Sequence, residues 1–171
     1  MRIRNGWPGM VGFVPIAFTL AIAHLSATSA AEGRSPTALT RAFYAWRLGS
    51  ESARSASRFA GTRPFLTQHL FAELSQVEAI EKRDHRAILD FDPFTDAQIA
   101  ATSVDVVSAA VRPQSANVIV IVRFRGASHR MRVSFEKSGL GWRISDFVGR
   151  GGGLEALLRN DLREVRAAPR L

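Results

Sequence analysis

Arginine is the chemically active residue type that clusters most clearly in this sequence. Arg123 and Arg125 end one alternating apolar run, and Arg130 and Arg132 repeat the two-residue spacing after the next turn. Successive side chains of a strand leave opposite faces, so each pair shares one face of its strand. Because a guanidinium matches carboxylate and phosphate groups, this face is a candidate site for a small anionic ligand or an acidic protein partner. The alternative is a solvated exterior whose arginine stems shield the sheet.

Side chains that act as acids, bases or nucleophiles are scattered along the chain. His69, His85 and His129 stand alone, with no paired motif around any of them, and there is no cysteine. A catalytic acid or base needs a pocket and a partner group within reach. We therefore assign no catalytic residue and no cofactor, and we favour a binding module over an enzyme.

Three aspartates lie close together in the segment 88–96. Asp90, Asp92 and Asp96 offer the oxygen ligands that Ca²⁺ prefers, but the segment lacks the glycine and the closing glutamate of an EF-hand loop. Pro93 keeps the backbone before it out of a helix. We therefore expect local turn hydrogen bonds from these carboxylates and assign no metal site.

A glycine run that contains one arginine, at residues 149–153, precedes the last helical pattern. Free amides at the start of a helix attract anions, which would suit a phosphate-binding loop. The spacing matches neither the dinucleotide nor the nucleoside-triphosphate fingerprint. We therefore expect a flexible link, followed by an amphipathic closing helix that ends before Pro169.

The arginines belong to a segment with the pattern of an antiparallel meander. β-Branched and aromatic residues form short runs within 117–147, and glycines divide these runs near residues 126 and 140. An earlier run at 102–111 supplies one more strand. Val118, Val120 and Val122 point to one face, so a one-residue slip in register would bury charged groups. A four-stranded antiparallel sheet follows.

Helical periodicity appears twice before the sheet. Ser35 and Pro36 suit the start of a first helix, whose apolar residues recur at steps of three and four. The second pattern occupies residues 62–85. Two N-terminal helices, a four-stranded antiparallel sheet and a C-terminal helix make an α+β domain.

Residues 1–31 have the pattern of a secretory signal peptide. Two arginines precede an apolar stretch at 11–23, and small residues precede Glu32. The alternative, an uncleaved anchor, needs about 20 apolar residues to cross a bilayer. We expect cleavage, no stable membrane anchor, a single domain at 32–171 and a periplasmic or secreted location. The formal net charge of +8 suits an acidic partner, and export argues against nucleic acid.

Three short motifs carry a resemblance to a known family: 43–46 (Phe-Tyr-Ala-Trp), 92–94 (Asp-Pro-Phe) and 142–146 (Trp-Arg-Ile-Ser-Asp). Together they resemble a bacterial family of small exported proteins of unknown function, which is placed with the cystatin-like cone fold of the nuclear transport factor two superfamily. The resemblance implies a curved sheet and a cone-shaped cavity, and similar folds often form homodimers through the open face of the sheet. Some similar folds use such a cavity for isomerase or dehydratase chemistry, so a small-molecule enzyme is the alternative function. The candidate cavity-lining residues are Phe43, Tyr44, Trp46 and Trp142.

Overall fold

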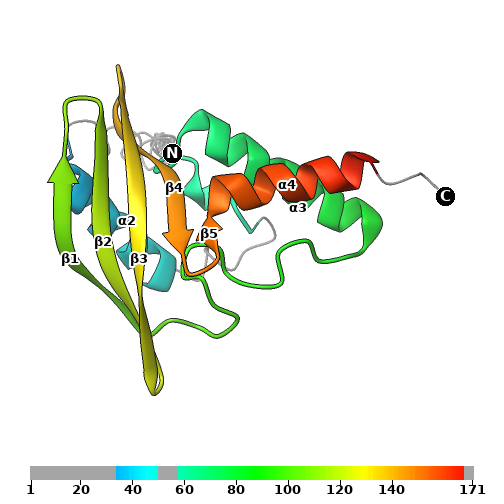
Figure 1. Ribbon diagram of the computed structural model, residues 1–171, viewed down its shortest axis with the longest axis horizontal. Helices are drawn as coiled ribbons and strands as arrows, with labels where there is room; N and C mark the ends of the chain where they lie inside the picture. The colour runs from blue at the N-terminus through cyan, green and yellow to red at the C-terminus, as the bar shows by residue number, and fades with distance from the viewer. Residues whose placement is uncertain (1–33, 50–57, 168–171) are drawn as a thin grey trace, which may run out of the picture.

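The structure is a computed structural model that describes residues 34–49 and 58–167 (Figure 1). The expected signal peptide at 1–31 lies outside the described residues. Two helices come first, α2 (Pro36–Gly49) and α3 (Gln68–Asp84), with the short 3-10 helix η2 (Ala60–Thr62) between them. Within the described residues, no helix is both long enough and apolar enough to span a membrane.

A five-stranded antiparallel sheet follows, with the strands in chain order. Its strands are β1 (Ser103–Val111), β2 (Ser115–Phe124), β3 (Ala127–Ser138), β4 (Gly141–Gly149) and β5 (Gly152–Gly153), and α4 (Leu154–Ala167) closes the chain. The α+β class and the antiparallel meander are therefore confirmed, but the predicted number of four strands is wrong.

The extra strand comes from the glycine run that was expected to be a flexible link. Gly149 pairs with Gly152, and Val148 pairs with Gly153, so the chain reverses sharply and adds β5 beside β4. Gly152 has φ +113°, a conformation that L side chains rarely adopt. The run is thus a tight turn that leads directly into α4.

The predicted alternation of faces is confirmed in β2 and β3. Val118, Val120 and Val122 are fully buried on the inner face, as is Val133. Figure 1 shows α2 behind the sheet, and α3 and α4 beside each other beyond β4. In this view no described helix covers the outer face of β1, β2 and β3.

The side chains of β4 do not follow strict alternation. Simple alternation would place Ile144 and Phe147 on opposite faces, yet both are buried in the core. The register shifts by one residue between Ser134 and Phe135 of the paired strand β3. A β-bulge changes which side chains face inward, and hydrophobic alternation alone does not reveal it.

The second helix begins later than its periodicity predicted. Leu66 forms a parallel bridge with Ile144 instead of a helical turn. Thr67 then caps α3, and its side chain accepts a hydrogen bond from the amide of Leu70 at 3.3 Å. The apolar residue Leu66, before the cap, therefore pairs with the sheet, although its spacing also fits a helix.

Candidate functional site

The outer face of the sheet brings three of the four predicted arginines together. Arg130 lies opposite Ile121, and Arg132 lies opposite Ile119. Arg123 belongs to the same face of β2, and Arg125 follows in the turn between β2 and β3. All four arginine side chains are exposed. We call these four arginines with the two isoleucines the arginine face.

Most of the positive charge on this face is not neutralised by neighbours. The Nε of Arg123 lies 2.7 Å from Oδ2 of Asp105. Within the described part of the chain, no ion pair or side-chain hydrogen bond involves Arg125, Arg130 or Arg132. Three guanidinium groups are therefore available to a partner, although solvent satisfies them in its absence.

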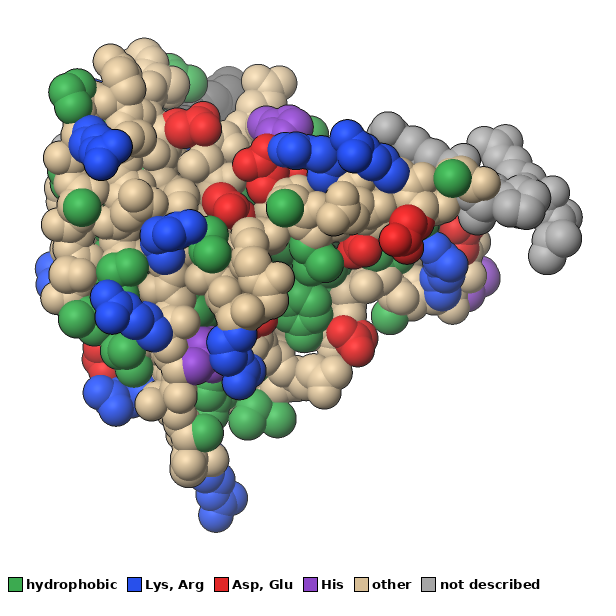
Figure 2. Space-filling model, in the orientation of Figure 1, with side chains coloured by type: hydrophobic (Ala, Val, Ile, Leu, Met, Phe, Trp, Pro, Cys, Tyr) green, Lys and Arg blue, Asp and Glu red, His purple; other side chains and the backbone are tan. Residues whose placement is uncertain are grey.

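An apolar strip runs between these charges. Ile119 and Ile121 are half-buried, and Val107 of the neighbouring strand β1 is 58% exposed. Figure 2 shows hydrophobic and basic side chains side by side over this part of the sheet. Protein interfaces typically combine an apolar centre, arginine and a polar rim, and this face has that composition.

The four predicted cavity-lining residues lie in or against the core of the described part of the chain. Phe43 is fully buried, and its ring centroid lies 5.3 Å from that of Phe94 and 5.3 Å from that of Phe147. Trp46 packs beside Phe43, whereas Trp142 lies at the edge of the core below the ammonium group of Lys137. The aromatic rings around Phe43 form a packed core.

Tyr44 is buried in this core. Its hydroxyl donates a hydrogen bond to the backbone carbonyl of Phe94 at 2.8 Å. Burial of the phenol, with a smaller effect from the negative charge of Asp92, raises the pKa of Tyr44 well above its usual value. A buried, hydrogen-bonded phenol of this kind does not favour the alternative of acid–base catalysis.

The aspartates near the glycine run hold backbone amides. Oδ2 of Asp96 accepts a hydrogen bond from the amide of Arg150 at 2.9 Å, and Oδ1 of Asp146 accepts one from the amide of Glu155 at 3.0 Å. These carboxylates occupy donors that a phosphate group would need. Asp92 accepts a turn hydrogen bond from the amide of Phe94. No group of three metal-ligating side chains occurs among the described residues.

The role of Asp146 was not predicted from the sequence. It lies near the end of β4 yet binds the first turn of α4. Burial raises its pKa, and hydrogen bonds from the amides of Glu155 and Phe147 oppose that effect. Only the tight turn at β5 brings the carboxylate to the helix, so no local sequence signal reveals this contact.

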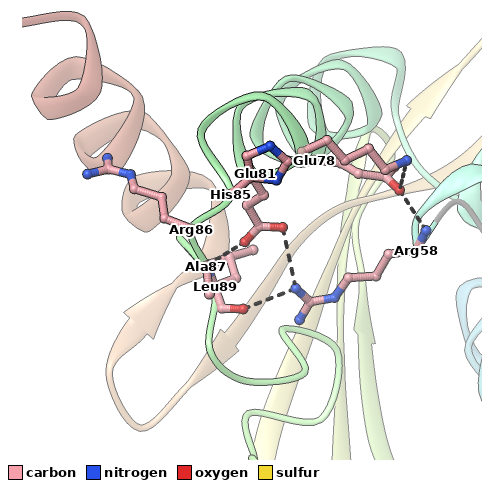
Figure 3. Close-up of a pocket in the computed structure, with 8 residues that line it drawn as sticks. Arg58, Glu78, Glu81, His85, Arg86, Ala87 and Leu89 are labelled. Atoms are coloured by element: carbon pink, nitrogen blue, oxygen red, sulfur yellow. Dashed lines mark hydrogen bonds and ion pairs between the residues drawn. The ribbon is translucent and has the colours of Figure 1, made fainter. Parts of the chain in front are cut away.

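A charged hollow of about 430 Å³ lies at the end of α3 (Figure 3). Arg58, Glu78 and Glu81 point toward one another, whereas the guanidinium group of Arg86 points away from them. Arg58 donates to the carbonyl of Leu89 at 3.0 Å, and Glu81 accepts from the amides of Ile88 and Leu89 at 2.8 and 2.9 Å. We interpret these hydrogen bonds as structural, because they hold the segment after α3 in place.

The three histidines considered in the sequence analysis lie in three different surroundings. His69 lies within 3.4 Å of Glu73 and 3.7 Å of Glu155 on the surface between α3 and α4. His85 ends α3 in a left-handed conformation, and the ring of His129 stacks on Phe124. The structure therefore brings no two of them into one site.

Replacing Glu73 by glutamine is expected to flatten the pH dependence of stability. Oε2 of Glu73 is buried without a hydrogen-bond partner, and burial raises the pKa of this carboxyl above its usual value of 4.5. A raised pKa in the folded state stabilises at low pH, and this contribution is lost as the pH rises through the folded-state pKa. The Glu73→Gln variant lacks this loss.

Urea unfolding at a series of pH values from acid to neutral measures the effect. The parent protein should lose more stability than Glu73→Gln as the pH rises. Equal losses in both proteins would show that ionisation of Glu73 carries no cost. His69, Glu155, Arg159 and Asp146 also act on this carboxyl and are unchanged in the variant.

Comparison with known proteins shows the fold. No protein-family profile and no curated protein sequence matches the chain. Among solved structures, the chain is similar to one from the type VI native effector–immunity complex Tae3–Tai3 of Ralstonia pickettii, with a TM-score of 0.53 and 15% identity, over 68% of this chain and 95% of that chain. This similarity shows a shared fold and no more.

Two other structures are less similar. A SEC-C motif containing protein from Rhodopseudomonas palustris gives a TM-score of 0.42 and 20% identity, over 69% of this chain and 78% of that chain. A phospholipid-binding protein from Ralstonia solanacearum, in complex with a phospholipid, gives 0.38 and 16%, over 81% and 80% of the two chains. We base no conclusion on either.

Proposed function

We propose that this chain is a non-catalytic binding module of the cell envelope that docks an acidic protein partner on the arginine face. The observation that carries this function is the position of Arg130 and Arg132, which have no described ion-pair partner, beside the half-buried Ile119 and Ile121, with Arg125 in the adjoining turn. Opposite charge on a partner would speed association and fix its orientation, while the isoleucines supply apolar contact.

A partner of opposite charge suits this face better than a second copy of the chain. A symmetric homodimer through the arginine face would bring arginines of both copies together, and like charges across an interface are unfavourable. The similarity to a chain of the Tae3–Tai3 complex adds support at the level of fold, because that chain belongs to an assembly of proteins. An immunity or inhibitor role is one form that such binding takes.

The cellular location and the finer fold assignment are parts of the same hypothesis. The signal-peptide pattern of residues 1–31 supports export to the periplasm or beyond. The sheet with α2 along its inner face supports the cystatin-like cone fold, with the cone filled by the aromatic core around Phe43. A filled cone agrees better with binding on the outer face than with chemistry inside.

Affinity capture from envelope extracts tests the function. We expect the wild-type protein to retain an acidic protein in stoichiometric amount, with less retained at high ionic strength because salt screens exposed charges. The Arg130→Glu/Arg132→Glu variant should bind that protein at least about tenfold more weakly, since charge reversal converts attraction into repulsion.

The matched control is Arg86→Glu/Arg163→Glu. Both residues are exposed and lie away from the arginine face, and the change in net charge is the same. This control should bind the partner like the wild type. Equal retention by the wild type and the Arg130→Glu/Arg132→Glu variant would contradict docking on the arginine face.

A further inference from the structure

A separate cavity lies beside the β4–β5 turn, where α4 begins. Its volume is about 220 Å³, and it is partly enclosed. Figure 2 shows a recess with hydrophobic side chains below α4. The apolar side chains that line the cavity are Phe91, Pro93, Met131, Phe147, Leu154 and Leu157. We call it the glycine-walled cavity, because four glycines of the β4–β5 turn also line it.

The floor of the glycine-walled cavity is hydrocarbon. Met131, Phe147 and Leu154 are almost completely buried there. Asp96 is the one ionisable side chain in the lining, and its Oδ2 already accepts a hydrogen bond from the amide of Arg150. Apolar cavities of about 150 Å³ stay dry and take up benzene, so a cavity of this size and lining suits a hydrocarbon group.

The glycine wall of the cavity is fixed in the structure without a ligand, because two carboxylates pack against it. A Cβ atom on Gly149 would lie 2.4 Å from Oδ2 of Asp96, and one on Gly153 would lie 2.4 Å from Oδ2 of Asp146. The two carboxylates therefore pack directly against the glycine backbone. A preformed wall lowers the cost of ordering the site when a ligand binds.

A second, more polar hollow of about 510 Å³ adjoins the cavity, since the two share Phe91 and Asp96 in their linings. The second hollow also carries Gln98 and Arg150, together with Ile99, which is 59% exposed. Leu157 at the cavity is 37% exposed. Exposed apolar residues thus lie beside both hollows. The polar groups of the second hollow could contact the polar end of a ligand whose apolar part lies in the cavity.

We infer that the glycine-walled cavity binds the hydrocarbon part of a small neutral amphiphile, such as a medium-chain alcohol, with its polar end in the second hollow. Asp90, Asp96 and Arg150 place charges of both signs around that hollow. A ligand with one strong charge would meet a like charge there, whereas a hydroxyl finds hydrogen-bond partners of either kind. This site is independent of the arginine face.

The methyl group of Met131 reports directly on the cavity floor. The chain contains three methionines, Met1, Met10 and Met131. In the full chain labelled with carbon-13 at the methionine methyl groups, loss of one signal in Met131→Leu assigns that signal to Met131. Titration with octanol should then shift it in a saturable way. A shift that never saturates, or no shift, would overturn the inference.

Charged analogues test the proposed class of ligand, and a matched pair of variants tests the location of the site. Octanoate and octylammonium should each bind at least about fivefold more weakly than octanol, because each would meet a like charge in the second hollow. Leu157→Trp should weaken octanol binding to a similar extent by filling part of the cavity, while Leu140→Trp, at an exposed turn far along the sheet, should not. Tighter binding of a charged analogue, or unchanged binding by Leu157→Trp, would contradict the proposed ligand class or site.

Discussion

Replacing Phe43 by alanine is expected to lower the free energy of unfolding by about 3–5 kcal/mol, as large-to-small changes of buried aromatic residues do. Phe43 is fully buried, and its ring contacts the rings of Tyr44, Trp46 and Phe65 as well as two others, Phe94 and Phe147. These partners come from α2, from the chain before α3, from the segment before β1 and from β4. The alanine variant therefore loses contacts that join four parts of the fold.

Urea unfolding followed by circular dichroism measures this loss. Phe43→Leu is the matched control, because it keeps most of the volume and should cost clearly less than alanine. A cost below about 1 kcal/mol for Phe43→Ala would mean that the site is loosely packed. That result would reopen the hypothesis of a ligand cavity inside the cone.

Replacing Gly153 by alanine is expected to cost about 1–3 kcal/mol through overpacking. The new Cβ would lie 2.4 Å from Oδ2 of Asp146. That carboxylate is held by the amides of Phe147 and Glu155 at 2.9 and 3.0 Å, so it moves away only by losing hydrogen bonds. The start of α4 should therefore be disturbed together with β5.

Gly151→Ala is the control for this change. It lies in the same turn, and a Cβ there would meet no atom within 4 Å. Its free energy of unfolding should stay within about 0.5 kcal/mol of the wild type. In the Asp146→Ala/Gly153→Ala double variant, the glycine change should cost less than it does alone, because the clashing group has gone. Strict additivity of the two changes would contradict the proposed clash.

Structural features that follow from a short repeat in the sequence were predicted correctly. The alternation in β2 and β3 determines which side chains face the core, and it also places Arg123, Arg130 and Arg132 on the outer face. The local turn hydrogen bond of Asp92 was predicted as well, because it joins residues only two positions apart, but the one predicted for Asp96 was not found, since that carboxylate binds the distant amide of Arg150.

Features that depend on distant contacts were not predicted. The bulge that turns Phe147 inward arises from pairing with β3, and Leu66 is extended because it meets Ile144. Asp96 and Asp146 bind amides of the glycine run that the fold brings to them. The glycine-walled cavity combines three segments that are separated in the sequence, so no local pattern predicts it.

Arginine footprinting tests the docking surface most directly. The protein is treated with phenylglyoxal alone and in the complex purified from the envelope, and modified arginines are identified by mass spectrometry. Docking on the arginine face predicts that Arg125, Arg130 and Arg132 lose reactivity in the complex, whereas Arg86 and Arg163 keep theirs. Unchanged reactivity of Arg130 and Arg132 in a stoichiometric complex would contradict the proposal that this face binds the partner.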